Sequence, residues 1–258
     1  MKTSTWAQFP YDDTDYTYAG NQLADSWPEL HRGDCEPLPG NEQLLEAWRS
    51  YHAGDFAGAV DLAEEIGIDA HAVANKASGI YADYLEEDDD AKLEIYTTGI
   101  ARAETAIEQF PDDANAHYFH AFLLGRYSQC ISITKALSQG VGGKIRASLK
   151  AALELAPEHA EAHTALGLYH AEIIDKIGKM IGGMTYGASA DEAMEHFRQA
   201  LELTPDAPIA HIEYGNGLYL LYGDKRLDES NAAYEKAAAI KPIEAMQKLD
   251  VEFAKASI

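Results

Sequence analysis

The sequence contains only two cysteines, Cys35 and Cys130, among its 258 residues. They lie far apart in dissimilar surroundings, so a disulfide is not expected, and Cys130 is expected to be a core side chain of an apolar helix. No apolar run approaches the ~18 residues of a membrane span. The first residues contain neither the apolar stretch and cleavage site of a secretory signal nor a cysteine for lipid attachment. We therefore expect a cytoplasmic protein.

Basic residues are also scarce. The chain has 20 Lys and Arg against 43 Asp and Glu, for a formal net charge of -23. Residues 1–113 carry 25 acidic and 6 basic side chains, whereas residues 114–258 carry 18 and 14. Such a charge repels nucleic acid, which we exclude as a partner. At 47% hydrophobic residues, the chain is instead able to fold around a substantial core.

One stretch lacks acidic residues altogether. Residues 114–153 contain no Asp or Glu, and they include Arg126, Lys135, Lys144, Arg146 and Lys150. A locally basic helical surface of this kind could dock against the acidic half of the chain or against a neighbouring subunit of a homo-oligomer. The alternative is a surface that binds an anionic partner. The sequence leaves both interpretations open.

A two-helix pattern recurs along the chain. Prolines end successive segments, small residues stand five positions before them, and mostly bulkier apolar residues stand three positions further back. The prolines are Pro111, Pro157, Pro205 and Pro242, preceded by Ala106, Ala152, Ala200 and Ala237 and by Ala103, Leu149, Phe197 and Tyr234. Histidines follow the first three prolines by six residues, at His117, His163 and His211. In the clearest copy, residues 160–205, Gly167 is small enough for close helix approach and Phe197 supplies apolar filling.

This pattern resembles the tetratricopeptide repeat (TPR) family. The resemblance implies an all-α fold, a right-handed α-α superhelix of about five helical hairpins with a C-terminal capping helix. The units are expected at residues 41–67, 70–111, 112–157, 158–205 and 206–242, with the cap at 243–258, all in one solenoid domain.

Two of these units are longer than the others. The proline spacings of 46 and 48 residues exceed the 34-residue repeat of the family. Apolar residues continue the first helix of each unit, at Tyr127 to Leu137 and at Ile173 to Ile181, and glycines follow. We therefore expect elongated first helices of about 22–26 residues, or ~33–39 Å.

The two ends of the chain differ from the repeats. Residues 1–40 are rich in aromatic and acidic side chains, and their prolines disfavour a long helix. We expect an irregular arm that packs on the solenoid or on another subunit, the alternative being a disordered acidic tail. In the capping helix, Ile243, Met246, Leu249 and Phe253 are expected to point inward and Glu244, Lys248 and Asp250 outward.

No residue set indicates catalysis, a metal or a cofactor. The three histidines at equivalent positions are explained by packing, so we expect no metal site. Gly140 to Arg146 does not match a phosphate-binding loop, because Ser138 stands where glycine is needed and Ile145 where Ser or Thr is needed. We expect a protein that is not an enzyme.

The TPR resemblance implies a concave groove lined by the first helix of each unit. Its candidate lining is apolar and aromatic and consists of Asn115, Tyr118, Phe122, Arg126, Thr164, Leu168, Ile212, Asn216 and Tyr219. This lining suggests a non-catalytic interaction or scaffold module that binds an apolar or helical segment of a protein partner. The groove could instead be filled by the helix extensions or by the N-terminal arm.

A weaker resemblance points to an alternative function. Elongated units with glycine-ended inserts over about residues 90–250 resemble the T component of TRAP-type transporters, whose members are trimeric periplasmic lipoproteins proposed to pass apolar ligands. This resemblance implies a module that binds an apolar or acyl-like small molecule.

Overall fold

The computed structural model describes residues 3–11 and 16–258, and these residues form helices without any β-strand. Part of the predicted arm, residues 1–2 and 12–15, lies outside the described residues. The predicted all-α architecture is confirmed. Among the helices of the described residues, none is both long and apolar enough to cross a lipid bilayer.

Contacts divide the chain into two compact units. The first comprises residues 1–31, 36–141 and 243–246, and the second comprises residues 32–35, 142–242 and 247–258. The first unit thus gathers the N-terminal half of the chain with a short C-terminal piece, and the second gathers most of the C-terminal half.

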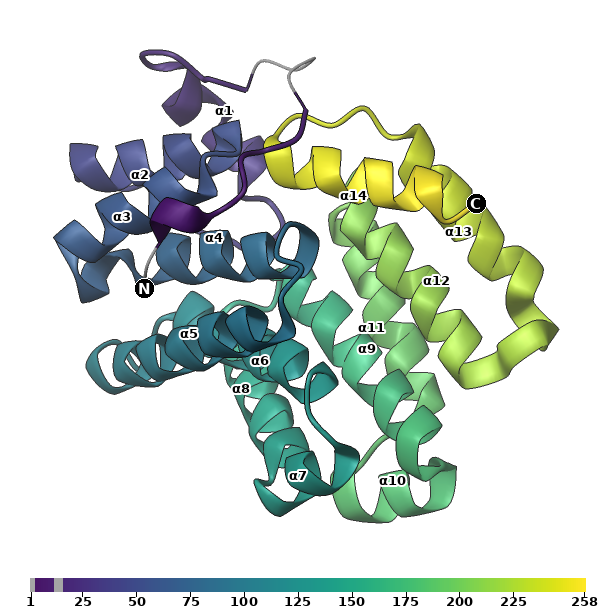
Figure 1. The fold of residues 1–258 in the computed structure, drawn as a ribbon. Helices are drawn as coiled ribbons and strands as arrows, with labels where there is room; N and C mark the ends of the chain where they lie inside the picture. Colours follow the sequence, from purple (N-terminus) through teal and green to yellow (C-terminus); the bar gives the residue numbers. More distant parts are fainter. Residues whose placement is uncertain (1–2, 12–15) are drawn as a thin grey trace. The chain divides into compact units, whose positions relative to one another are not determined.

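Helical hairpins form most of the first unit (Figure 1). The helices are α2 (Glu42–Ala53), α3 (Phe56–Ile66), α4 (His71–Tyr84), α5 (Asp89–Gln109), α6 (Ala114–Gln129) and α7 (Ile133–Ser138), with a 3₁₀ turn η2 (Ile68–Ala70) before α4. From α2 to α6, each helix packs against the next. The predicted hairpin over 41–67 is therefore present, and Gly54 makes its turn with a φ of 90° that disfavours other residues.

Acidic side chains begin two helices of this unit. Asp88 accepts a hydrogen bond from the Ala91 N–H at the start of α5. Asp113 accepts from the N–H groups of Asn115 and Ala116 at the start of α6. Each carboxylate satisfies N–H groups that have no partner within the helix.

The N-terminal segment packs on the first unit through its aromatic rings. It contains a 3₁₀ turn, η1 (Thr3–Thr5), and a nine-residue helix, α1 (Gln22–Leu30), which the expected irregular arm did not include. The Trp6 ring stacks on Tyr81 at 4.0 Å between centroids. Trp27 is buried, and its indole N–H donates to the Glu36 carbonyl oxygen at 2.8 Å. This burial explains why so many aromatic residues occur before the first hairpin.

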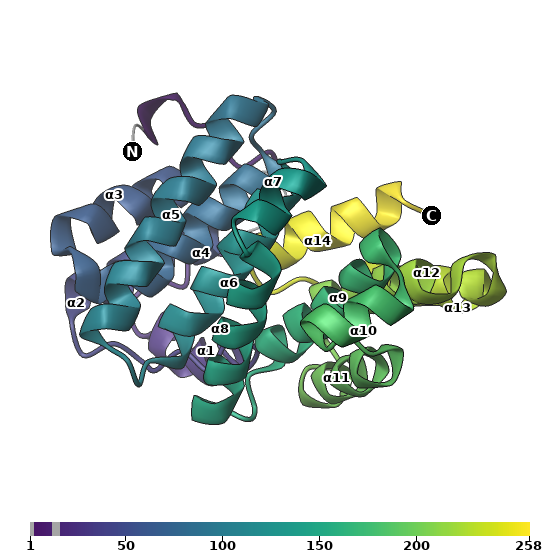
Figure 2. The same cartoon turned by 90° about the horizontal axis from the view of Figure 1, so that it is seen from below.

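The second unit also consists of successive helices. They are α8 (Val141–Leu155), which begins at the boundary, α9 (Ala160–Ile177), α10 (Lys179–Tyr186), α11 (Ala190–Leu203), α12 (Pro208–Tyr222), α13 (Leu227–Ala239) and α14 (Ala245–Ala256), with a 3₁₀ turn η3 (Gly223–Arg226) between α12 and α13. Helix α9 packs against both α11 and α12, and α12 packs against α13 (Figures 1 and 2). The unit predicted at residues 206–242 contains the hairpin of α12 and α13.

The predicted elongated helices are wrong in one respect. The extra residues are helical, but they form the separate short helices α7 and α10 instead of extending α6 and α9. Helix α6 ends at Gln129, and the Ser132 side chain caps a new helix. Helix α9 ends at Gly178, whose φ of 82° lies outside the helical region. Gly178, which precedes the glycines expected to end the extension, thus breaks the helix about one turn earlier than the apolar pattern indicates.

One phenylalanine forms the centre of the second unit. Phe197 of α11 is fully buried. A Cβ atom added to Gly167 of α9 would lie 2.9 Å from its ring, and one added to Gly217 of α12 would lie 2.3 Å from it. Both distances are too short for a real contact, so the two glycines make room for the ring. The predicted close approach at Gly167 is confirmed.

The C-terminal helix α14 is present, and Met246 and Leu249 are buried as predicted, but the orientations predicted for its polar side chains and for Phe253 are wrong. Glu244, just before the helix, and Lys248 and Asp250 within it are buried, whereas Phe253 is 46% exposed. These polar groups are tolerated because they have partners: Glu244 binds His52, and Lys248 donates to Glu252 at 3.1 Å. The expected assignment assumed that charged side chains face water, which fails where ion pairs form.

The packing of the N-terminal segment generates a stability prediction. Replacing Trp27 by alanine should lower the free energy of unfolding by about 3–5 kcal/mol, because it removes a large buried ring and its hydrogen bond. Urea unfolding followed by circular dichroism would measure the loss. The matched control is Leu38→Ala, at a side chain that is 50% exposed in the same segment, where a change within about 0.5 kcal/mol is expected. Equal effects of the two substitutions would contradict the packing of this segment.

Candidate functional site

The nine predicted groove residues fall into both units. Four lie on α6 of the first unit. The side chain of Asn115 is buried and donates to a Glu36 carboxylate oxygen at 2.6 Å, and Tyr118 is buried against Phe122. Arg126 pairs with Asp83 at 3.0 Å and lies over the half-buried Phe122 ring. Within this unit, Glu36 of the predicted arm thus occupies one position of the expected lining.

The other five lie on α9 and α12 of the second unit. Thr164 is buried and donates to the Ala160 carbonyl oxygen, and Ile212 packs in a buried cluster with Ala237 and Ala254. Asn216 accepts a hydrogen bond from the Tyr234 hydroxyl at 2.5 Å. Leu168 is half-buried, and Tyr219 is 54% exposed. Of these five side chains, Tyr219 is the one most open to a partner.

The predicted set omitted three exposed apolar side chains of the second unit. Met180, Ile181 and Met184 of α10 are 75%, 55% and 85% exposed. Their helical spacing resembles the apolar stripe of a core-facing helix, so the sequence pattern predicted that Ile181 continues the buried stripe of α9. The signal that could have identified them is Gly178, since a glycine there allows the helix to break and α10 to present another face.

Three histidines make the same contact at equivalent positions. The Nε2 atoms of His117, His163 and His211 lie 2.8, 3.0 and 2.8 Å from the carbonyl oxygens of the prolines six residues earlier. Because a carbonyl only accepts, each histidine donates from Nε2. This contact ties the loop between two hairpins to the following helix, which supports the packing role predicted for these residues.

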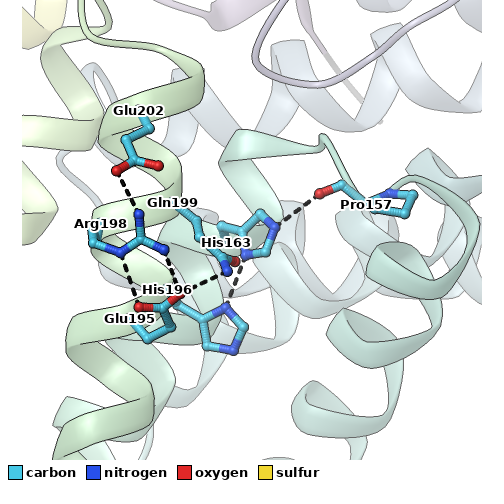
Figure 3. Close-up of polar contacts among 7 residues, drawn as sticks. All are labelled: Pro157, His163, Glu195, His196, Arg198, Gln199 and Glu202. Carbon is cyan, nitrogen blue, oxygen red and sulfur yellow. Dashed lines mark hydrogen bonds and ion pairs between the residues drawn. The ribbon is translucent and has the colours of Figure 1, made fainter.

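A second histidine contacts His163 (Figure 3). The Nδ1 atoms of His163 on α9 and His196 on α11 are 2.9 Å apart. Since His163 carries its proton on Nε2 for the Pro157 carbonyl, its Nδ1 accepts and His196 Nδ1 donates. Both rings are neutral in this arrangement. Burial, together with the neighbouring His163 and His170, lowers the pKa of His196 to about 4.

His170 extends this group toward the start of α11. Its Nδ1 accepts from the Ser189 N–H at 3.3 Å, so its Nε2 carries the proton and faces a Glu192 carboxylate at 3.2 Å. Burial lowers the pKa of His170, and also that of His163. Helices α9 and α11 are therefore joined by three histidines whose neutral forms fit the observed hydrogen bonds.

The outer face of α11 carries a row of charged side chains beside the three histidines. Arg198 donates to Glu195 and to Glu202, each at 2.5 Å, one turn before and after it (Figure 3). The side chains are about half exposed. Exposed pairs of this kind contribute little to stability.

A buried polar chain lies in the first unit. His52 Nδ1 contacts a Glu244 carboxylate oxygen, and His52 Nε2 is 3.2 Å from His31 Nε2. Trp27 stacks on His31 at 4.0 Å. Burial lowers the pKa of His52, while Glu244 acts in the opposite direction. All three polar side chains are almost fully buried, so this chain holds α1, α2 and residues 243–246 together and offers no access to a substrate.

No metal centre is apparent in the part of the chain that the structure describes, where no three His, Cys, Asp or Glu side chains are grouped to hold an ion. The two cysteines there are not in a disulfide. The thiol of Cys35 is exposed in this structure, and partial burial together with the nearby Asp34 raises its pKa to about 11, which disfavours a reactive thiolate. The candidate site is accordingly the exposed helix surface.

The described residues thus form an all-α protein of packed helical hairpins with exposed apolar side chains. The family model "Regulator of microtubule dynamics protein 1-3" matches residues 58–254. The chain therefore belongs to this family. No curated protein matches the chain.

This family membership corrects the expected one. The chain is not assigned to the TPR family, and the weaker resemblance to the T component of TRAP-type transporters fails with it. The pattern of small residues, bulky apolar residues and terminal prolines arises wherever helical hairpins pack closely, because close helix approach needs small side chains and proline ends a helix. The pattern therefore reports the packing and does not identify the family.

The histidine group generates a pH prediction. The unfolded chain takes up protons below the ordinary histidine pKa of about 6.5, whereas His196 resists protonation until about pH 4. The free energy of unfolding should therefore be highest above pH 6.5 and fall as the pH drops toward 4. Replacing His196 with glutamine should reduce this slope, as measured by urea unfolding at several pH values.

The control for this experiment is His117→Gln. His117 makes the same contact with a proline carbonyl, but no second histidine ring among the described residues lies against it. The His117→Gln substitution should leave the slope of the free energy of unfolding against pH largely unchanged. An identical slope for wild type and His196→Gln would contradict the proton assignment.

Proposed function

We propose that this chain is a non-catalytic protein-interaction module that binds an apolar or helical segment of a partner protein. The name of its family, regulator of microtubule dynamics, supports a partner among microtubules or the proteins that act on them. The all-helical architecture supports recognition by a helix surface.

The exposed ring of Tyr219 carries this proposal. It is 54% exposed on α12, next to the fully buried Leu218. The helix is thus fixed in place on one side and presents a large aromatic ring on the other. Tyrosine is common at the energetic centres of interfaces, because its ring buries a large area with few rotatable bonds and its hydroxyl keeps a hydrogen bond.

The packing of α12 supports a preformed surface. Gly217 lies directly against Phe197 of α11, and Gly215 against Tyr234 of α13. The backbone of the turn before Tyr219 is therefore constrained by close contacts with two neighbouring helices. A rigid anchor loses less conformational entropy when a partner binds than a mobile one does.

The use of the histidines supports a role without catalysis. His163, His196 and His170 are engaged with a proline carbonyl, with each other and with the start of α11. Their lowered pKa values follow from this burial. A general base instead requires access to a reacting group.

Co-sedimentation with polymerised tubulin, together with imaging of growing microtubules, tests the proposal. Wild-type protein should bind or alter growth and shrinkage, and Tyr219→Asp should weaken binding by roughly tenfold or more. Phe253→Asp is the matched control, since Phe253 is a 46% exposed ring of the same unit. Full activity of Tyr219→Asp, or no effect of the wild-type protein on microtubules, would contradict the proposal.

A further inference from the structure

Helix α10 has its large and small side chains in unusual places. Its buried position is Gly182, which packs against Ile173 of α9: an added Cβ atom would lie 3.0 Å from the Ile173 Cγ2 atom. Its exposed positions include Met180, Ile181 and Met184. A helix on a protein surface ordinarily directs its large apolar side chains inward and its small polar ones outward. Here the arrangement is reversed.

This exposure is costly for an isolated chain. Burying a Met or Ile side chain stabilises a folded chain, so three exposed ones forgo that stabilisation. Single exposed apolar residues are ordinary, but three on consecutive turns of one helix form a patch. Methionine is also suited to binding surfaces, because its flexible thioether adapts to the shape of a partner.

Contacts at both ends hold α10 in this orientation. Gly178 before it and Gly187 after it have φ values of 82° and 62°, which end the helix sharply. The Tyr169 hydroxyl of α9 donates to the Tyr186 carbonyl oxygen at 3.3 Å, and the Ser189 N–H donates to His170. Helix α10 thus lies fixed beside α9 (Figures 1 and 2). It presents the three apolar side chains in this fixed position.

The surroundings of the patch are basic although the chain as a whole is acidic. Residues 177–190 contain one charged side chain, Lys179, and residues 142–153 of α8 contain no acidic residue. Helix α8 lies beside α10, because Gly142 faces the Tyr186 ring and the Arg146 guanidinium lies against Gly187. Lys144 of α8 is exposed. Part of the stretch without acidic residues, residues 114–153, thus lies on α8 beside the patch.

One polar atom where α8 meets the end of α10 has no hydrogen-bond partner in the part of the chain that the structure describes. Arg146 Nε is buried and makes no hydrogen bond within the described residues. Among the acidic side chains near these helices in sequence, Glu172 of α9 is paired with Lys176 at 3.0 Å, and Glu192 of α11 faces His170. Asp175 and Asp191 are exposed, and Glu154 lies at the far end of α8. The charged side chains that α8 and α10 themselves place around the patch are the basic Lys144, Arg146 and Lys179.

We propose that the α10 surface, formed by Met180, Ile181 and Met184 with Lys144 and Lys179, is the docking site for an acidic amphipathic helix of a partner protein. This inference rests on the proposed function as an interaction module and adds a second surface, separate from Tyr219. The apolar face of the partner helix covers the two methionines and the isoleucine, and its carboxylates face the lysines.

Charge favours a short helix over an anionic membrane as the occupant. A peptide helix senses the field within about 8 Å of the patch at physiological salt, where lysines dominate. A bilayer surface extends much further and would also face the acidic remainder of a chain with a net charge of -23. A second copy of this chain meets the same repulsion.

The test uses two synthetic helical peptides of roughly 18 residues, about five turns. Both carry leucines on one face, and the flanking positions are glutamate in one peptide and lysine in the other. Fluorescence anisotropy of the labelled peptides with the full chain should show binding of the glutamate peptide and at least roughly tenfold weaker binding of the lysine peptide.

Variants locate the site. The double substitution Met180→Asp with Met184→Asp should weaken binding of the glutamate peptide by roughly tenfold or more, and Lys179→Glu should weaken it while improving binding of the lysine peptide. Phe253→Asp is the matched control for an exposed apolar residue elsewhere in the second unit and should bind like wild type. Because Met180 and Met184 are exposed, unchanged thermal unfolding should confirm that the double variant folds.

Several results would overturn the proposal. The first two are equal binding of both peptides and unchanged binding by the double variant. The third is binding only to vesicles of phosphatidylcholine and phosphatidylserine. The fourth is self-association of the chain instead of peptide binding, with the self-association lost in the double variant. Any of them, obtained while Tyr219→Asp still abolishes microtubule binding, would reject the α10 site and leave the proposed function standing.

Discussion

The ring of Phe197 between Gly167 and Gly217 is the contact on which the second unit depends. The ring comes from α11, and the two glycines come from α9 and α12, so one side chain sets the spacing of three helices. Helices whose small residues face a large ring can approach closely without an empty cavity. The positions of the loops and of the short helix α10 follow from this spacing.

Polar contacts complete what the apolar packing begins. In the second unit, His163 joins the loop at Pro157 to His196 on α11, and this pair requires α9 and α11 to be close. In the first unit, His52 links His31 to Glu244 beneath the Trp27 ring. In the second unit, His163, His196 and His170 are neutral because each has a defined donor and acceptor. The exposed helix surfaces, and not these buried groups, are left for partners.

The packing could largely be predicted from the sequence. The repeated spacing of prolines, alanines and bulky residues identified the hairpins, the bounds of α12 and the contact of Gly167 with Phe197. Such features are local, because helix periodicity and small residues act over a few turns. The same locality explains the wrong family: any closely packed hairpin produces this pattern.

The features that were missed depend on contacts between distant parts of the chain. Glu244 is buried because His52, 192 residues away in sequence, binds it, which no local pattern can indicate. The apolar stripe continuing into Ile181 predicted a buried helix, but Gly178 ends α9 and reorients the residues that follow. For the same reason, the sequence identified Tyr219 as a candidate contact and overlooked Met180 and Met184.

A double-mutant cycle on Phe197 and Gly217 tests the central contact most directly. Gly217→Ala in the wild-type background places a methyl group against the ring, whereas in a Phe197→Leu background the smaller side chain leaves room for it. The account predicts that the two substitutions are coupled by at least about 1 kcal/mol in the free energy of unfolding, with Gly217→Ala much less destabilising beside leucine. Additive effects, within about 0.5 kcal/mol, would show that the ring and the glycine do not determine the helix spacing.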